Sequence, residues 1–353
     1  MTQTADPGAA APPAATGLSP VERRELAERI LLYAIVAALL IWLATRLFVD
    51  PTTWFTTLLN GLNNGALYAL IALGYTMVYG IIELINFSHG DLFMLATVTS
   101  GIFMITWLGA EEWGPDTFLI MLLTLVVVMT LAAGLNTAAA RVAYRRLRRA
   151  PKLAPLITAV GLSFIYQWAG IRLNGSGPKN WTRLLGDEGF FIGPVEVRWT
   201  TVIVIGVTVP LLLLMTFIVQ RTRQGKAMRA TAQDQDAARL MGINVDRTIA
   251  FTFALGGALA GAAGLLWLQS IGNTRYDAGF QLGLIAFTAA VLGGIGNLNG
   301  AVIGGVLIGL IQAYNETFGF GQKWDQTVVF GILIFLMVFK PEGLLGKRTT
   351  EKV

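Results

Sequence analysis

Three things are scarce in this 353-residue chain: cysteine is absent, histidine occurs once, and charged residues make up only 13%. Without cysteine there is no disulfide framework, thiolate metal site or cysteine nucleophile. The single histidine, His89, excludes a multi-histidine metal site and argues against a Ser-His-Asp hydrolase. The phosphate-binding pattern G-x-x-x-x-G-K-[ST] is also missing, because Arg348 follows Gly346-Lys347. We therefore expect no metal or other cofactor on this chain, and any nucleotide to be hydrolysed by another chain.

The shortage of charge also sets the class of protein. Soluble domains carry about 25% charged residues, roughly twice the fraction found here. With 54% hydrophobic residues and a mean hydropathy of +0.62, the chain has too few charged side chains to cover a water-soluble body. Most of its surface must face lipid. The same composition argues against a disordered chain, a collagen and a coiled coil.

Apolar stretches of roughly 17–25 residues follow one another along the chain, and this length spans a hydrocarbon core of ~30 Å. We expect ten spans, at about 30–49, 54–80, 92–109, 117–140, 153–173, 200–220, 248–271, 281–296, 300–318 and 326–340. The second, eighth and ninth are rich in Gly and Asn, which predicts bent or broken helices. The fold class predicted is an all-α integral membrane protein, a polytopic helical bundle.

Basic residues divide the chain further. Residues 1–29 read as a disordered, charged extension, 30–340 as the membrane domain and 341–353 as a tail. Most of the 26 Lys and Arg residues lie in 23–29, 141–152, 221–247 and 340–352. These segments alternate with the spans, so the positive-inside rule predicts that both termini are cytoplasmic. The net charge of +5 then follows from topology and needs no nucleic-acid partner.

Two short motifs suggest pseudo-repeated halves. Residues 85–90 (INFSHG) and 295–300 (IGNLNG) are both polar segments that end in Gly and precede an apolar helix. Interrupted helices at corresponding places in two halves mark the substrate path of many transporters. Two such loops also arise by chance. Glycine pairs at four-residue spacing, such as Gly257 and Gly261, indicate close helix packing.

Polar side chains inside apolar spans are costly, which makes them functional candidates. Asn60, Asn63 and Asn64 fall on one helix face and either line a path or fix the packing. Asp91, with Ser88, is placed to cap the helix that follows, and His89 is expected to be hydrogen-bonded and structural rather than a proton relay. The candidates for a substrate path are Asn60, Asn63, Asn64, Asn86, Ser88, His89, Asn297 and Asn299.

The basic segment 221–247 predicts a short helix with an apolar face. Asp234 stands where the helix begins, and Gly242 where it stops. Ala237, Leu240 and Met241 share one face, which predicts either a docking element for another protein or a helix on the bilayer headgroups. The candidate partner-binding residues are Arg229, Ala230, Ala232, Asp234, Ala237, Ala238, Arg239, Leu240, Met241, Gly242 and Ile243.

This segment resembles the cytoplasmic signature of ABC-importer membrane subunits, whose short coupling helix seats in a cleft of the ATPase subunit. Ala230-Thr231-Ala232 stands where that signature has Glu-Ala-Ala, and Gly242 at its glycine. The missing Glu is typical of the LivH-type permeases of branched-chain amino acid importers. Further similar stretches are 60–80 (ending GYTMVYG), 85–90, 141–145 (RVAYR), 287–296 (FTAAVLGGIG) and 341–346 (PEGLLG). The resemblance covers roughly 53–353, and residues 1–50 depart from it.

The resemblance implies a permease subunit, not an enzyme, that translocates branched-chain or related amino acids by alternating access. The implied partners are a LivM-type permease subunit, two ABC ATPase subunits that carry ATP and magnesium, and an extracytoplasmic substrate-binding protein, in a bacterial or archaeal plasma membrane. Urea or short amides are alternative cargoes. A secondary transporter driven by ions is the other class, for which Glu83 and Asp91 are the available acids.

Overall fold

The computed structural model describes residues 41, 44–110, 113–147, 150–151, 153–186 and 188–346. The extension 1–29, most of the predicted span 30–49 and the end of the tail lie outside the described residues. The chain divides into two compact units, Met1–Trp54 and Phe55–Val353. The second unit contains the features discussed below.

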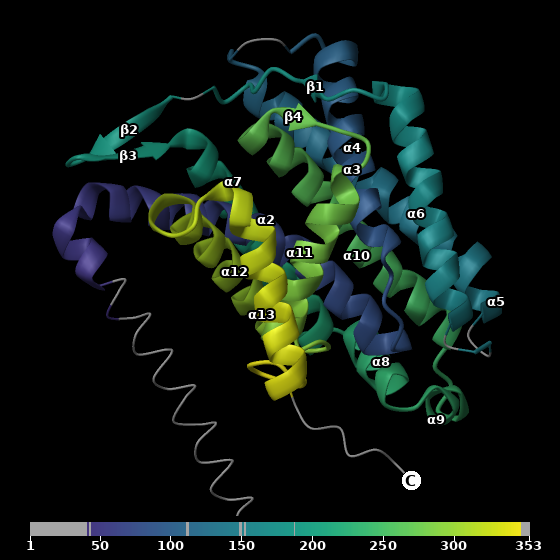
Figure 1. The fold of residues 1–353 in the computed structure, drawn as a ribbon. Coiled ribbons are helices and arrows are strands. Elements are labelled where there is room, and N and C mark those ends of the chain that lie inside the picture. Colours follow the sequence, from purple (N-terminus) through teal and green to yellow (C-terminus); the bar gives the residue numbers. More distant parts are fainter. Residues whose placement is uncertain are drawn as a thin grey trace, which may run out of the picture. The chain divides into compact units, whose positions relative to one another are not determined.

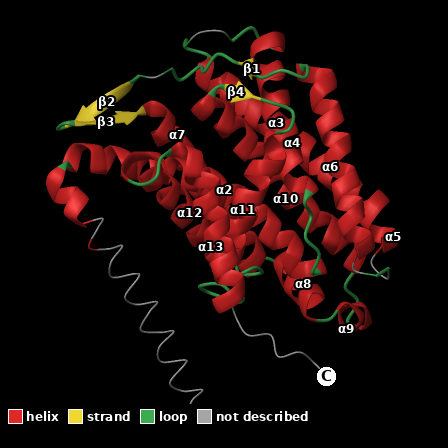
Figure 2. Ribbon diagram, viewed as in Figure 1, coloured by secondary structure: helices red, strands yellow, loops and turns green. Residues whose placement is uncertain are grey.

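Helices dominate the described residues (Figures 1 and 2). They are α2 (Pro51–Ile82), α3 (Ser88–Gly101), α4 (Thr117–Ala139), α5 (Arg145–Leu147), α6 (Leu153–Asn174), α7 (Trp199–Arg221), α8 (Arg223–Gln233), α9 (Gln235–Leu240), α10 (Val245–Ile271), α11 (Ala278–Gly293), α12 (Leu298–Phe318) and α13 (Asp325–Phe339). The π-helical turns η1 (Ile102–Trp107) and η2 (Ala140–Tyr144) extend α3 and α4, and the 3₁₀ turn η3 (Gln322–Trp324) precedes α13. Four short strands form two antiparallel pairs, β1 (Lys179–Asn180) with β4 (Asn273–Thr274) and β2 (Gly189–Ile192) with β3 (Val195–Arg198).

Eight helical segments in the described residues are long and apolar enough to cross a membrane. The predicted helical membrane protein is therefore confirmed. The helix α11, at 16 residues, is apolar but shorter than a full span. The count of ten spans stays a prediction, because most of 30–49 lies outside the described residues.

The helices form an inner and an outer set. Within an apolar stretch of 18 residues taken from each helix, 83% of the stretch in α2 and 78% of that in α10 is buried. The corresponding share is 22% in α4 and in α7. Glycines allow the inner contacts: a Cβ on Gly309 would lie 2.2 Å from the backbone nitrogen of Gly65, and one on Gly261 2.7 Å from the carbonyl oxygen of Val128. The predicted close packing at glycine pairs is confirmed.

The interruptions fall at the two predicted motifs and not inside the spans. The helix α2 is continuous over 32 residues, so the expectation that its Asn and Gly residues break it is wrong. The Asn and Gly residues pack against α12 and α10 instead, and the backbone hydrogen bonds of α2 continue without a break. Both α3 and α12 begin at the fourth residue of their motif, Ser88 and Leu298.

The first interruption lies beside the interior of neighbouring helices and not at their ends. His89 packs on Gly74, about two turns before the end of α2, and Asp91 binds Ser163, nearly three turns into α6. At 1.5 Å per residue these positions are about 12–15 Å from the helix ends. The segment 83–87 thus turns back beside α2, and α3 begins next to the interior of α2 and α6.

The segments predicted to be cytoplasmic meet at one end of the second unit. Arg145, after α4, pairs at 3.0 Å with Asp246 of the 221–247 segment. The tail joins the same end, where Leu345 donates its N–H to the carbonyl of Gly293. At the other end, the 174–199 connection is held by Trp181, which bonds the carbonyl of Gly272 and the hydroxyl of Thr274. Figure 1 shows α8 and α9 at the end opposite β1 and β4.

Candidate functional site

The helix α9 is capped at both ends by its own sequence. The Asp234 side chain accepts hydrogen bonds from the N–H groups of Asp236 (2.8 Å) and Ala237 (3.0 Å), as an N-cap does. Gly242 follows at φ 81°, a left-handed conformation that suits glycine, and donates to the carbonyl of Arg239. The predicted start and stop of this short helix are confirmed.

One apolar edge of α9 is uncovered. Leu240 and Met241 are 90% and 82% exposed, and Ala237 beside them is exposed too. Ala238 is only 3% exposed and packs inward with the partly buried Ile243. The helix is therefore anchored on one side and presents the predicted apolar face on the other.

The predicted partner-binding residues separate into two groups. Asp234, Ala237, Arg239, Leu240, Met241 and Gly242 belong to the exposed edge and caps of α9. Arg229, Ala230 and Ala232 belong to α8, which begins at the cap Thr222. Ala230 packs against the core, whereas Arg229 and Ala232 face a cavity.

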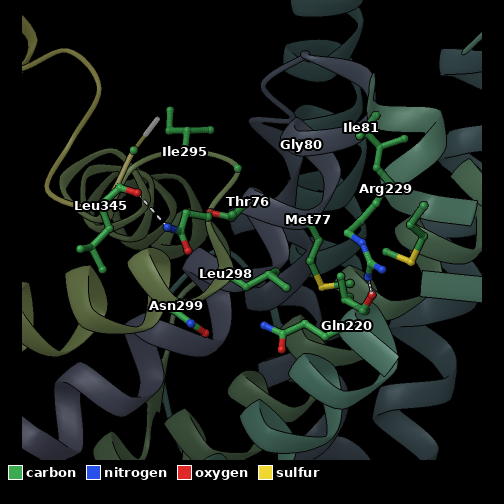
Figure 3. Close-up of a pocket in the computed structure, with 16 residues that line it drawn as sticks. Thr76, Met77, Gly80, Ile81, Gln220, Arg229, Ile295, Leu298, Asn299 and Leu345 are labelled. Carbon is green, nitrogen blue, oxygen red and sulfur yellow. Dashed lines mark hydrogen bonds between the residues drawn. The ribbon is translucent and has the colours of Figure 1, made fainter. Parts of the chain in front are cut away.

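This cavity has a volume of about 550 Å³ and three walls (Figure 3). Its lining residues are Thr76, Met77, Gly80 and Ile81 of α2; Val219, Gln220, Met228, Arg229 and Ala232 of α7 and α8; and 295–299, Leu345 and Gly346 of the α11–α12 turn and the tail. In Figure 3, Arg229 and Gln220 lie across from Leu298 and Asn299. Arg229 is the one ionisable side chain of the lining.

The tail forms part of this wall. Leu344 donates its N–H to the carbonyl of Leu292, and the amide of Asn297 donates to the carbonyl of Leu345, both at 2.8 Å. Asn297 also accepts from the N–H of Gly300 and so caps α12. Of the two predicted path residues here, Asn297 has a structural role, whereas Asn299 is exposed at the cavity.

The three asparagines of α2 lie in its other half and point to different partners. Asn60 accepts a hydrogen bond from Arg198 of β3, and Asn63 donates to Ser270 of α10 at 2.7 Å. Asn64 is partly buried and accepts from Asn63. Asn63 therefore fits the packing alternative, because its amide ties two inner helices together.

Asn86, Ser88 and His89 form a buried cluster at the start of α3. Asn86 accepts from Ser88 (2.5 Å) and from the hydroxyl of Tyr144 (2.8 Å). His89, 1% exposed, meets Tyr75 edge to face at 4.9 Å between ring centroids. Neither of its ring nitrogens has a hydrogen-bond partner among the described residues. Packing against Gly74 and Tyr75 holds the ring in a structural position, with the backbone of Ile71 beside it, and the hydrogen bond expected for His89 stays a prediction.

Asp91 does not cap α3 with its side chain, so the expectation of a cap is wrong. It lies in the first turn of α3, but its carboxylate accepts from the Ser163 hydroxyl and from the Gln167 amide (3.2 Å) of α6. Burial among α3, α6 and α11 turns the carboxylate toward the polar side chains of a neighbour. Asp91 therefore joins two helices.

The residues that complete this cluster were missed in the sequence. Ser163 and Gln167 lie four residues apart on α6, so they share a face, and this spacing was the available signal. Tyr144 gave no such signal, because it follows a membrane span in a basic segment. The predicted path residues thus lie in three places and form no single site: the first half of α2, the start of α3, and the α11–α12 turn at the α9 end.

Comparison with known proteins now adds to this geometry. A family model described as a branched-chain amino acid transport system permease component matches residues 57–338. The high-affinity branched-chain amino acid transport system permease protein BraD of Pseudomonas aeruginosa is 40% identical over 303 residues, 84% of this chain and 97% of that relative. The corresponding LivH proteins are similar, at 38% identity in Escherichia coli K12 (83% and 96%) and 37% in Salmonella typhimurium (83% and 96%).

No solved structure matches the chain. Among the described residues there is also no group of three His, Cys, Asp or Glu side chains that could hold a metal ion. The family match covers most of the chain, and the relatives match nearly their whole length. With its membrane helices and the geometry of its α7–α10 segment, this chain belongs to the family of branched-chain amino acid transport system permease components, which are transport subunits and not enzymes.

Proposed function

We propose that this chain is the membrane-spanning permease subunit of an ATP-driven importer of branched-chain or related amino acids. The names of its relatives support the cargo, and the few charged side chains inside its spans suit a zwitterion. The permease works by alternating access. Its partners are two ATPase subunits that hold ATP and magnesium, a LivM-type permease subunit and an extracytoplasmic substrate-binding protein.

The exposed edge of α9 is the observation that carries this proposal. An amphipathic helix that lies on a bilayer has a polar face rich in Lys and Arg. In α9 and its cap, Asp234 and Asp236 stand beside a single basic residue, Arg239, which pairs with Asp236 at 2.7 Å. Anionic headgroups would repel the two acids. The helix α9 has only six residues, and Leu240 and the following Met241 are exposed. Such a short helix with an exposed apolar edge instead suits a cleft in a protein, which the ATPase supplies.

The test is a charge placed in the apolar edge. Ala237→Glu buries an unpaired carboxylate if an ATPase covers α9, which costs several kcal/mol and lowers affinity by orders of magnitude. We expect the permease to be inserted at normal abundance, without co-purifying ATPase, and uptake to fall at least tenfold. The matched control is Gln233→Glu, an exposed position on α8. Retained ATPase and uptake in Ala237→Glu would contradict the proposal.

Gly242 offers a second, independent variant. Any side chain at φ 81° costs about 1 kcal/mol, yet nothing among the described residues lies within 4 Å of where a Cβ would stand. Gly242→Arg should therefore leave the membrane domain folded but tilt or fray α9. We expect weaker ATPase association, with Gly177→Arg in the opposite connection as control.

The orientation proposed is a multi-pass protein of the inner (plasma) membrane, with both termini in the cytoplasm. It is supported by the basic segments that meet around α8 and α9. Because the chain has no cysteine, single introduced cysteines report accessibility without background. Gly177→Cys should react with an impermeant reagent from outside, and Gln235→Cys from inside. The reverse pattern at either site contradicts this orientation.

A further inference from the structure

The cavity between α2, α8 and the α11–α12 turn contains a buried hydroxyl without a partner. Threonines in these helices normally bond the carbonyl four residues earlier, as Thr97, Thr124 and Thr288 do. Thr76 is 1% exposed and lines the cavity, yet its hydroxyl has no hydrogen-bond partner among the described residues. A buried, unmade hydrogen bond is costly. A polar ligand in the cavity would satisfy it.

Two parts of the lining, which lie across the cavity from each other (Figure 3), are suited to a carboxylate. Arg229 is the one ionisable lining residue, and one of its five N–H donors goes to the carbonyl of Val219. The 21-residue helix α12 begins in the lining at Leu298, with Asn299 next to it. The first backbone N–H groups of this helix and the positive end of its dipole would stabilise a bound anion.

Other groups of the lining are suited to an ammonium group. The last turn of α2 lines the cavity at Gly80 and Ile81, and α2 ends at Ile82. Carbonyls at a helix C-terminus lack intrahelical partners and form the negative end of the dipole. No carboxylate lines the cavity, so these carbonyls and the Gln220 side chain are the acceptors for a cation.

Apolar side chains complete the lining. Met77, Ile81 and Leu298 supply a surface for an aliphatic group, and the volume of about 550 Å³ lies within the range of small-molecule sites. We propose that this cavity binds a small aliphatic amino acid as its zwitterion at the α9 end of the permease, where the cargo is held before release. The inference rests on the proposed function, because it takes the cargo to be an amino acid and this end to be cytoplasmic.

Protection of an introduced cysteine tests the site without measuring transport. Ala232→Cys places a thiol in the lining, and Lys226→Cys places one on the same helix outside it. Inverted membrane vesicles that contain the full transporter are labelled with an impermeant maleimide, with and without L-leucine. We expect L-leucine to slow labelling of Ala232→Cys and not of Lys226→Cys. Equal labelling with and without L-leucine would overturn the proposal.

Two analogues test the zwitterion. Isocaproate keeps the carboxylate and the branched chain without the ammonium group, and isopentylamine keeps the ammonium without the carboxylate. Each should need at least about tenfold more ligand for half protection than L-leucine, because each lacks one of the two charged groups that the lining would pair. If isocaproate protects as well as L-leucine, the site is an anion site and the proposal is wrong.

Variants in the Ala232→Cys background identify the groups that bind. Arg229→Gln should raise the half-protecting concentration of L-leucine at least about tenfold, and Thr76→Val about threefold. Arg223→Gln, an exposed basic residue of α8 outside the lining, should leave it unchanged. Retained ATPase association shows that each variant is folded. Unchanged protection in both Arg229→Gln and Thr76→Val overturns the site even where ATPase binding upholds the proposed function.

Discussion

Polar groups in the middle of this permease differ from those at its α9 end in how they are held. At the start of α3, Asp91 and Asn86 are almost fully buried and bonded across helices to Ser163, Gln167 and Tyr144. At the α9 end, Arg145 and Asp246 form an ion pair with side chains 63% and 42% exposed. A buried bond has no water to replace it, whereas an exposed pair does. The middle should therefore govern folding, and the α9 end should tolerate change.

The largest effect is expected at Asp91. Asp91→Leu leaves two donors, the buried Ser163 and the partly buried Gln167, without their acceptor, at a cost of about 2 kcal/mol or more. We expect several-fold less folded permease, measured as the monodisperse fraction after detergent extraction and as its apparent Tm.

Asp91→Asn is the matched control for that change. The Asn side chain keeps the shape, and the Ser163 hydroxyl and a flipped Gln167 amide can bond either of its ends. Most folded protein and most uptake should survive. If Asp91→Asn abolishes uptake at normal abundance, Asp91 has an ionic role in transport. The buried polar groups would then not act through folding alone, which contradicts the difference drawn between the two regions.

A smaller effect is expected at Tyr144. Tyr144→Phe removes one hydrogen bond to Asn86 and retains the ring packing against Phe253 at 5.5 Å. The free energy of unfolding should fall by about 0.5–1.5 kcal/mol. Tyr79→Phe, at a partly buried tyrosine for which no cross-helix hydrogen bond is seen, serves as control. An equal loss in both variants would show that the bond to Asn86 contributes little.

The smallest effect is expected at the exposed ion pair. Arg145→Gln should change the free energy of unfolding by less than about 1 kcal/mol, and less again at high salt, since water and ions screen the pair. A loss as large as that of Asp91→Leu would erase the difference between the two regions.

Local residue patterns in the sequence correctly predicted part of the candidate site. Asp234, Gly242 and the Ala237 face of α9 followed from local rules, because a cap, a left-handed stop and a helical face depend on near neighbours in the chain. Asp91 fitted the same rules and was assigned wrongly, because a capping position gives no information about a serine 72 residues further on. The packing of His89 could not be predicted for the same reason, since its ring lies against a glycine of another helix.

The cavity could not be predicted from the sequence. It joins Thr76, Arg229 and Leu345, which are far apart in the chain and carry no common motif. The tail reads as a polar end with a glycine turn, and only the hydrogen bonds of 344 and 345 to the end of α11 show that it closes a wall.

By itself, the sequence determined that this is a helical membrane protein, which spans are expected, and that 221–247 holds a capped helix with an apolar edge. Hydrophobic length, charge distribution and capping are local properties of the chain, which explains this success. Tertiary structure alone decided that α3 begins beside the interior of α2 and α6, that Asp91 binds α6, and which side chains enclose the cavity. Those outcomes depend on where helices distant in sequence approach each other, and that approach is set by glycine contacts such as Gly65 with Gly309.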